Sequence, residues 1–136
     1  MTPQEFIRKW SISALKERSG SQEHFIDLCH LLGHPTPAEA DPEGTSFTFE
    51  KGATKYGGGD GWADVWKKGH FALEYKGKHK DLDAAYEQLL RYRESLDSPP
   101  LLIVCDMQRF QVHTNITGTA KAVYSFTLKE LAEEKK

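Results

Sequence analysis

The sequence has little cysteine, no long hydrophobic run and no excess of positive charge. Its two cysteines, Cys29 and Cys105, lie in apolar stretches outside any Cys-x-x-Cys pair, which argues against a disulfide or a zinc site. No apolar run approaches the roughly 18 residues of a membrane span, and the first residues lack the apolar core of a signal peptide. We therefore expect buried thiols in a reducing cytoplasm and no membrane partner.

The formal net charge of −2 also excludes a protein that simply coats DNA, because such a protein should be basic. The charge is nevertheless segregated along the chain. Between residues 67 and 80 the only acid is Glu74, and it lies among seven basic or imidazole side chains: Lys67, Lys68, His70, Lys76, Lys78, His79 and Lys80. Such a patch suits a site that meets phosphate and holds a metal, although a solvated hairpin edge would give the same pattern.

Length and composition predict one globular domain with its own core. The hydrophobic pattern predicts helices over residues 2–14, 21–32, 82–96 and 127–136, and strands over 47–49, 62–67, 70–76, 101–105, 108–114 and 121–126. We expect a break at 19–21, a loop over 34–45 and a loop over 51–61, which holds five glycines. The result is an α/β domain with a mixed sheet flanked by helices, in which a hairpin leads through a helix to a buried strand at 101–105.

Asp64, Glu74 and Lys76 lie on the two strands of this hairpin. Two converging carboxylates can hold Mg²⁺, and a lysine beside them can orient or activate the attacking water. An acid, nine residues and then acid-x-lysine also occurs by chance in charged proteins, so the local context must support the interpretation.

The hydrophobic pattern selects one register for the hairpin. If Asp64 pairs with Glu74, the numbers of paired residues sum to 138. One face then carries Asp64, Trp66, Ala72, Glu74 and Lys76, and the other carries Ala63, Val65, Phe71, Leu73 and Tyr75. A slip by one residue would bury Asp64 without a partner. Amphipathicity therefore predicts the register that gathers the charges, with a three-residue turn around Gly69.

Glu17 and Glu23 are the candidates for a third acid. On a helix that continues through residue 17, Glu17 falls in line with His24 and Leu28 near the apolar stripe, whereas Glu23 is farther from it. We favour Glu17 and keep Glu23 as the alternative, because the expected break near Gly20 would interrupt that helix.

Gln88 and Tyr92 lie one turn apart on the helix that follows the lysine. Both can therefore point toward the charged face of the hairpin. A solvent-facing glutamine and a half-buried tyrosine would show the same spacing.

Several segments together resemble the core of PD-(D/E)xK nucleases. They are the glycine-rich loop, Ala63-Asp-Val-Trp66, Phe71-Ala-Leu-Glu-Tyr-Lys-Gly77 and Gln88-Leu-Leu-Arg-Tyr92. Residues 16–19, 24–29, 49–51, 81–86, 99–106 and 113–115 also look like the N-terminal nuclease domains of type IIL and type IIG restriction–modification enzymes. In those enzymes one polypeptide also carries an adenine-N6 methyltransferase and a target-recognition domain. Ala63 replaces the proline that usually precedes the first acid, a replacement common in the superfamily.

The resemblance implies a restriction-endonuclease-like fold in a single endonuclease domain, residues 1–136, either the N-terminal part of a larger polypeptide or a standalone relative. It implies Asp64, Glu74 and the backbone carbonyl of Tyr75 as Mg²⁺ ligands, with Mn²⁺ as a substitute, and Lys76 as the catalytic lysine. The implied supporting positions are Glu17, Gln88 and Tyr92. The expected contacts to the DNA backbone are Lys67, Lys68, Lys78 and Lys80.

The expected activity is hydrolysis of DNA phosphodiester bonds that leaves 5′-phosphate and 3′-hydroxyl ends. The expected partners are double-stranded DNA and the methyltransferase and target-recognition domains of a parent chain, through which alone S-adenosylmethionine would enter. The alternative is a catalytically inert domain of nuclease fold that serves DNA binding or assembly. A nucleotide-binding loop at Gly57–Gly61 fits less well, since no Walker lysine follows it.

Overall fold

The computed structural model describes residues 1–12, 17–54, 60–77 and 81–132, of which 17–19, 52–54, 60–62 and 131–132 are described by their backbone alone. Three helices come first: α1 (Pro3–Ile12), α2 (Glu17–Leu32) and α3 (Pro37–Ala40). The strands β1 (Phe47–Thr54), β2 (Asp60–Lys67) and β3 (Phe71–Tyr75) follow. Helix α4 (Leu82–Arg91) and the 3₁₀ helix η1 (Glu94–Leu96) lead to β4 (Leu101–Cys105), β5 (Arg109–Thr114), β6 (Val123–Thr127) and the 3₁₀ helix η2 (Lys129–Ala132).

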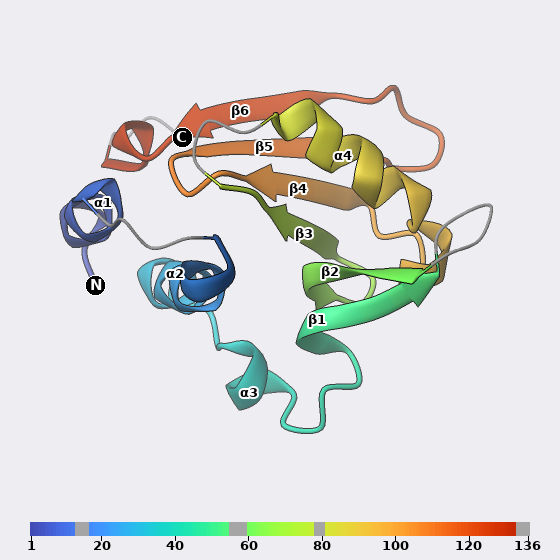
Figure 1. The fold of residues 1–136 in the computed structure, drawn as a ribbon, viewed down its shortest axis with the longest axis horizontal. Coiled ribbons are helices and arrows are strands. Elements are labelled where there is room, and N and C mark those ends of the chain that lie inside the picture. The colour runs from blue at the N-terminus through green and yellow to red at the C-terminus, as the bar shows by residue number, and fades with distance from the viewer. Residues whose placement is uncertain (13–16, 55–59, 78–80, 133–136) are drawn as a thin grey trace.

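The strands form one six-stranded sheet in which the order across the sheet is the order along the chain (Figure 1). β3 and β4 are parallel, and the other neighbours are antiparallel. A parallel pair needs a crossover, and α4 with η1 supplies it. The predicted mixed α/β architecture is confirmed.

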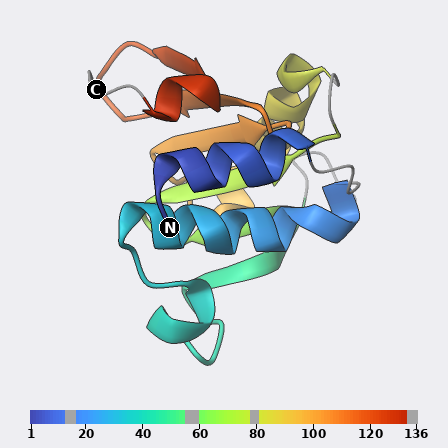
Figure 2. The same cartoon turned by 90° about the vertical axis from the view of Figure 1, so that its left-hand side faces the viewer.

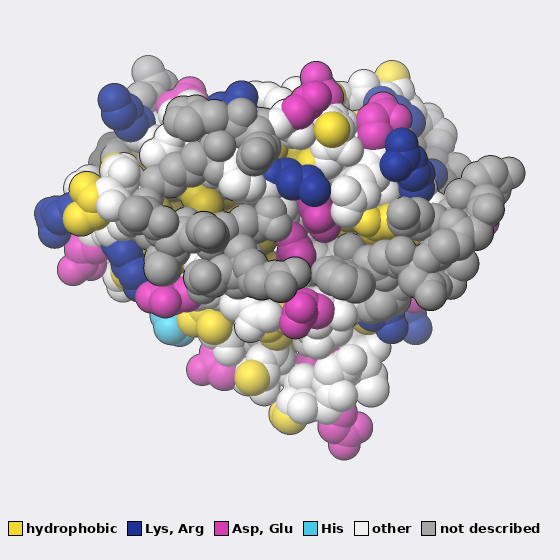
Figure 3. Space-filling view, viewed as in Figure 1, with side chains coloured by type: hydrophobic (Ala, Val, Ile, Leu, Met, Phe, Trp, Pro, Cys, Tyr) yellow, Lys and Arg dark blue, Asp and Glu magenta, His cyan; other side chains and the backbone are white. Residues whose placement is uncertain are grey.

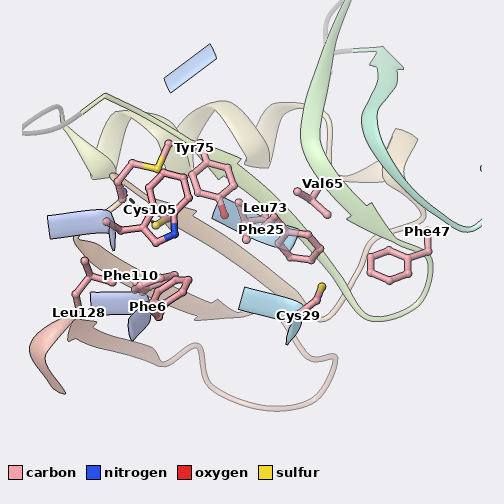
Figure 4. Close-up of a cluster of buried hydrophobic side chains, with 12 residues drawn as sticks. Phe6, Phe25, Cys29, Phe47, Val65, Leu73, Tyr75, Cys105, Phe110 and Leu128 are labelled. Carbon is pink, nitrogen blue, oxygen red and sulfur yellow. Dashed lines mark hydrogen bonds between the residues drawn. The ribbon is translucent and has the colours of Figure 1, made fainter. Parts of the chain in front are cut away.

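Helices cover both faces of the sheet. The front face is defined here as the side on which α4 packs, where Leu82, Ala85 and Leu89 meet residues such as Leu102 and Val104. The back face is the side on which α1 and α2 pack, side by side as Figure 2 shows. Its core is largely aromatic, and Figure 4 shows how these side chains gather: Phe6, Phe25, Phe47, Tyr75 and Phe110. Cys29 and Cys105 are buried there as free thiols, as expected.

The back face is not filled along its whole width. An apolar cavity of about 340 Å³ lies between α2 and the sheet. Its walls come from α2 and from strands β1, β3, β4, β5 and β6, and they include Phe25, Cys29, Leu73, Ile103 and Phe126.

The hairpin between β2 and β3 has the predicted register. Val65 pairs with Leu73, Trp66 with Ala72 and Lys67 with Phe71, so every pair sums to 138. The turn has the predicted three residues, 68–70, and Gly69 in it has φ of 77°. That left-handed conformation favours glycine because it has no Cβ.

The prediction was wrong for Ala63, which was expected on the back face with Val65. Ala63 is fully buried in the front-face cluster instead. The cause is a break in the alternation at Asp64. The ladder between β1 and β2 pairs Phe49 with Val65 and Lys51 with Ala63, and it skips Asp64 and Glu50, which has a left-handed φ of 52°.

The predicted break at residues 19–21 does not exist, because α2 runs without interruption from Glu17. Gly20 is buried, and the packing of the helix outweighs the low helix propensity of glycine. The predicted loop over 34–45 contains α3, whose capping box joins Thr36 and Glu39. The first helix begins as predicted, with the reciprocal bonds of Thr2 and Glu5 at 2.7 and 3.1 Å.

Other boundaries also differ from the predictions. β1 and β2 extend to Thr54 and from Asp60 into the predicted glycine-rich loop, since backbone pairing does not depend on side chains. The helix after the lysine ends at Arg91, and η1 completes the predicted span. At the C-terminal end, η2 takes the place of the first part of the predicted α-helix, although Thr127 and Glu130 make the expected contact; residues 133–136 lie outside the described residues.

Candidate active site

The structure brings Asp64, Glu74 and Lys76 together where β2 and β3 separate. Oδ2 of Asp64 accepts a hydrogen bond of 2.7 Å from the backbone N–H of Tyr75. A regular ladder would satisfy this N–H with a carbonyl of β2. Here the carboxylate of Asp64 accepts this hydrogen bond instead. The end of the ladder therefore holds Asp64 against the backbone of the residue that follows Glu74.

A glutamine ties the second carboxylate to the lysine. Nε2 of Gln88 donates to Oε2 of Glu74 at 3.2 Å, and Nζ of Lys76 donates to Oε1 of Gln88 at 3.3 Å. The same lysine nitrogen lies 3.7 Å from Oε2 of Glu74. Glu74 is only 5% exposed, and a buried carboxylate needs such partners to stay charged. We call these three residues the Glu74–Gln88–Lys76 network.

Tyr92 packs in the front-face cluster beside this network, and it is buried. Burial raises the pKa of its hydroxyl, a hydrogen bond with Gln88 opposes that rise, and the negative charges of Glu74 and Asp64 add to it. Tyr92, which directly follows α4, therefore contacts Gln88, and Gln88 in turn contacts Glu74 and Lys76.

Tyr75 connects the site to the back face. Its ring points away from the carboxylates, and its hydroxyl lies 2.8 Å from Nδ1 of His24 in a hydrogen bond. Both side chains are fully buried. Burial lowers the pKa of His24 to about 4, although the backbone of Met107 and the charge of Asp27 oppose that change. Burial also raises the pKa of the Tyr75 hydroxyl, so both partners are neutral near pH 7.

The third acid is resolved in part. Glu17 is the first residue of α2, and its side chain lies outside the described residues. Because α2 has no break, Glu17 falls on the same side of the helix as His24, which was the reason for preferring it. Glu23 forms an ion pair of 2.6 Å with Lys9 of α1. The structure therefore places Glu23 between two helices and not beside Asp64.

Two of the four predicted DNA-binding lysines, Lys67 and Lys68, belong to the described residues. Lys67 lies on the back face, with Nζ 3.0 Å from Nε2 of His34 and 5.3 Å from the ring centroid of Phe47. Lys68 is exposed in the turn, at the end of the hairpin opposite Asp64. Lys78 and Lys80 lie outside the described residues.

Lys51 has a position near the site that the sequence did not reveal. Its Nζ lies 4.6 Å from the ring centroid of Trp66, a residue of the front-face cluster. The sequence placed Lys51 in a loop, so that no alternation could assign it to a face. A longer strand prediction alone would not have found it, because regular alternation would place Lys51 on the same face as Phe47 and Phe49. The break at Glu50 moves it to the front face.

A scan against known protein families gives the origin of the domain. The model of the MmeI N-terminal domain matches residues 1–136, the whole chain. The chain belongs to this family. MmeI is a type IIL restriction–modification enzyme, so the family is a domain of restriction–modification enzymes, in line with the resemblance. No curated protein and no solved structure matches the chain.

The donor atoms of the site fit a hard cation. Among the described residues, no three His, Cys, Asp or Glu side chains are grouped so that they could hold a metal. Mg²⁺ does not need such a group, since it keeps several waters and binds through one or two carboxylates and other oxygens. Asp64 and Glu74, with the nearby backbone of Tyr75, therefore offer a suitable donor set.

In the part of the chain that the structure describes, no helix has the length and apolar character to cross a membrane.

Proposed function

We propose that the chain is a Mg²⁺-dependent DNA endonuclease domain of the PD-(D/E)xK type, with a restriction-endonuclease-like core, acting within a restriction–modification enzyme. The Glu74–Gln88–Lys76 network, formed beside Asp64 at the open end of a hairpin, carries the proposal. Burying an acid beside a lysine costs free energy of folding, and a hairpin with only a structural role would not require that arrangement. Membership in the MmeI N-terminal domain family supports a nuclease role.

Each residue of the site has a defined task in this proposal. Asp64, Glu74 and the carbonyl of Tyr75 would hold the metal, which when bound polarises the phosphate and lowers the pKa of a bound water. Nζ of Lys76 would donate a hydrogen bond to the attacking water or to a phosphate oxygen and stabilise the charge that develops there. Gln88 would keep Glu74 and Lys76 at a fixed separation, since its amide contacts both.

Double-stranded DNA is the proposed substrate, and a target-recognition domain and an adenine-N6 methyltransferase of the same polypeptide are the proposed partners. Contacts to phosphates position a protein on DNA without reading its sequence. We therefore expect the parent gene to continue into a methyltransferase with an Asn-Pro-Pro-Tyr motif, where S-adenosylmethionine would bind. A gene that ends at residue 136 would contradict this arrangement.

The activity is tested by nicking of supercoiled plasmid DNA in Mg²⁺ or Mn²⁺. We expect Asp64→Ala and Lys76→Ala each to lower the nicking rate by at least about 100-fold, as for the loss of one group that stabilises transition-state charge. Glu23→Ala, which removes an acid outside the site, is purified in the same way as a control and should nick at the wild-type rate. Circular dichroism and thermal unfolding would verify that each variant is folded.

The outcomes separate this proposal from its alternatives. Nicking that survives in Asp64→Ala would come from a contaminating nuclease and would overturn the assignment. A wild-type chain that binds DNA and does not nick it, even within its parent polypeptide and with either metal, would establish the inert DNA-binding domain instead.

A further inference from the structure

The front face is covered unevenly by the rest of the chain. α4 packs over β3 and β4, where its apolar residues meet Ala72 and Leu102. Over β1 and β2 the front face is covered by η1, which accepts a hydrogen bond of 2.9 Å from Nε1 of Trp66 at the carbonyl of Leu96. Figure 3, viewed as in Figure 1, shows acidic side chains near the middle of the molecule with a basic side chain beside them.

Lys51 lies on this part of the front face, on the strand that pairs with the strand of Asp64. It pairs across β1 and β2 with Ala63, the residue before Asp64. Its ammonium lies over the ring of Trp66, two residues beyond Asp64. Trp66 is 2% exposed, whereas Lys51 is partly exposed. The aromatic ring thus lies against the ammonium of Lys51, and the residue keeps part of its surface in solvent.

A further cation at such a position would strengthen the attraction of the front face for DNA. Asp64 and Glu74 bring two negative charges, and Lys76, which contacts Glu74, brings one positive charge. A bound Mg²⁺ would offset the remaining negative charge of these groups, and an accessible lysine on the same face would add attraction for the phosphates along the path of the strand. Lys67 cannot serve there, because its ammonium contacts His34 and Phe47 on the back face.

We propose that Lys51 binds a backbone phosphate of the DNA strand that crosses the front face, beside the strand's point of cleavage. This inference rests on the proposed endonuclease function and adds a substrate contact to it. Lys51 then lies on the β1 side of the two carboxylates, and Lys76 lies on the α4 side. The DNA strand passes over β2 between them.

The test compares two lysines of the same hairpin sheet that lie on opposite faces. Lys51→Gln and Lys67→Gln change the net charge equally, and their binding to a short fluorescein-labelled duplex is followed by anisotropy in Ca²⁺ at rising KCl. We expect Lys51→Gln to bind about 3- to 10-fold more weakly, the effect of one hydrogen-bonded contact. Its plot of log affinity against log salt should flatten by about 0.9, the slope of one phosphate contact on B-DNA. Lys67→Gln should match the wild type in both.

A solely structural role of Lys51 on Trp66 gives different results. Lys51→Arg keeps both the charge and the contact with the ring and should restore affinity and salt slope, and Lys51→Met keeps the apolar stem and should not restore either. A wild-type salt slope in Lys51→Gln, or an equal loss in Lys67→Gln, would overturn the proposal. So would weaker binding that follows the thermal stability of the variants and not their charge.

The failure of this inference can be told from the failure of the proposed function. Binding is measured also in Asp64→Ala without divalent metal, where the loss of a negative charge should leave DNA binding at least as tight as that of the wild type. If Asp64→Ala lacks nicking and Lys51→Gln binds normally, the nuclease stands and the role of Lys51 falls. A wild-type chain that neither binds nor nicks DNA overturns both.

Discussion

The two faces of β3 differ in what their alternating residues do. On the back face, Leu73 and Tyr75 enter a dense aromatic cluster, and the hydroxyl of Tyr75 meets a buried, neutral His24. On the front face, Ala72 packs under α4, and Glu74 meets Gln88 and Lys76. The back face thus pairs neutral groups away from water, whereas the front face keeps charges side by side next to solvent.

The alternation of side chains along β3 places residues that stabilise the fold on the back face and a residue of the candidate site on the front face. The back face supplies apolar burial, which is the main favourable contribution to folding. The front face bears the cost of placing a carboxylate where it is 5% exposed. Tyr75 joins the two, because its ring is fixed behind the sheet and its N–H holds Asp64 in front.

The largest effect on the back face should come from Leu73→Ala. Leu73 is 2% exposed and lines the cavity under α2, so its truncation would enlarge an existing void. We expect a loss of about 2–5 kcal/mol in the free energy of unfolding, measured by urea denaturation. The folded fraction should keep the nicking rate of the wild type. A stable variant without activity would show that the two faces are not separable.

His24 should make the back face sensitive to acid. Its pKa is about 4 in the fold and near 6.5 in the unfolded chain. As the pH falls below about 6.5 the unfolded chain binds the proton first, so this group lowers the free energy of unfolding until the pH reaches about 4. We expect a loss of roughly 2 kcal/mol between about pH 7 and pH 5.

The measurement compares urea denaturation of the wild type and His24→Gln at both pH values. Other groups also titrate in this range, so the prediction concerns the difference between the two proteins. Equal pH dependence would contradict it. If His24→Gln does not fold, NMR titration of the wild-type imidazole decides the matter, because a midpoint near 6.5 would exclude the buried neutral state.

The smallest effect should come from Gln88→Ala on the front face. The amide of Gln88 contacts Glu74 and Lys76 without touching the expected position of the metal. We expect a decrease of about 10-fold in the nicking rate, because the amide hydrogen-bonds two charged groups of the site but does not contact the reacting atoms. Glu87→Ala changes the exposed neighbour on the same helix and should have no effect. Equal rates for both variants would remove Gln88 from the site.

The features that depend on local periodicity could be predicted from the sequence. The register of β2 with β3 and the turn at Gly69 follow from the alternation of apolar residues. The meeting of Gln88 with Glu74 follows from helical spacing after a crossover. The same alternation would also have placed Lys67 on the back face, where it lies, so that its proposed contact with DNA did not follow from the predicted register.

The features that depend on tertiary structure could not be predicted. Gly20 is helical because its surroundings bury it, although glycine alone predicts a break. Ala63 changes face because the ladder skips Asp64 and Glu50. Lys51 reaches the front face because β1 continues beyond the expected strand and its alternation breaks at Glu50. In each case a distant part of the chain decides the outcome.

The order of the strands in the sheet has a consequence for how the site is assembled. Since each strand pairs with the next one along the chain, most pairings are local and need little loop closure. The crossover through α4 is the one longer excursion in the described sheet. Asp64 and Glu74 belong to the hairpin before it, and Gln88 and Tyr92 belong to the crossover itself. We expect the two carboxylates to meet early in folding, and the groups that stabilise them to arrive only when the two halves of the sheet join.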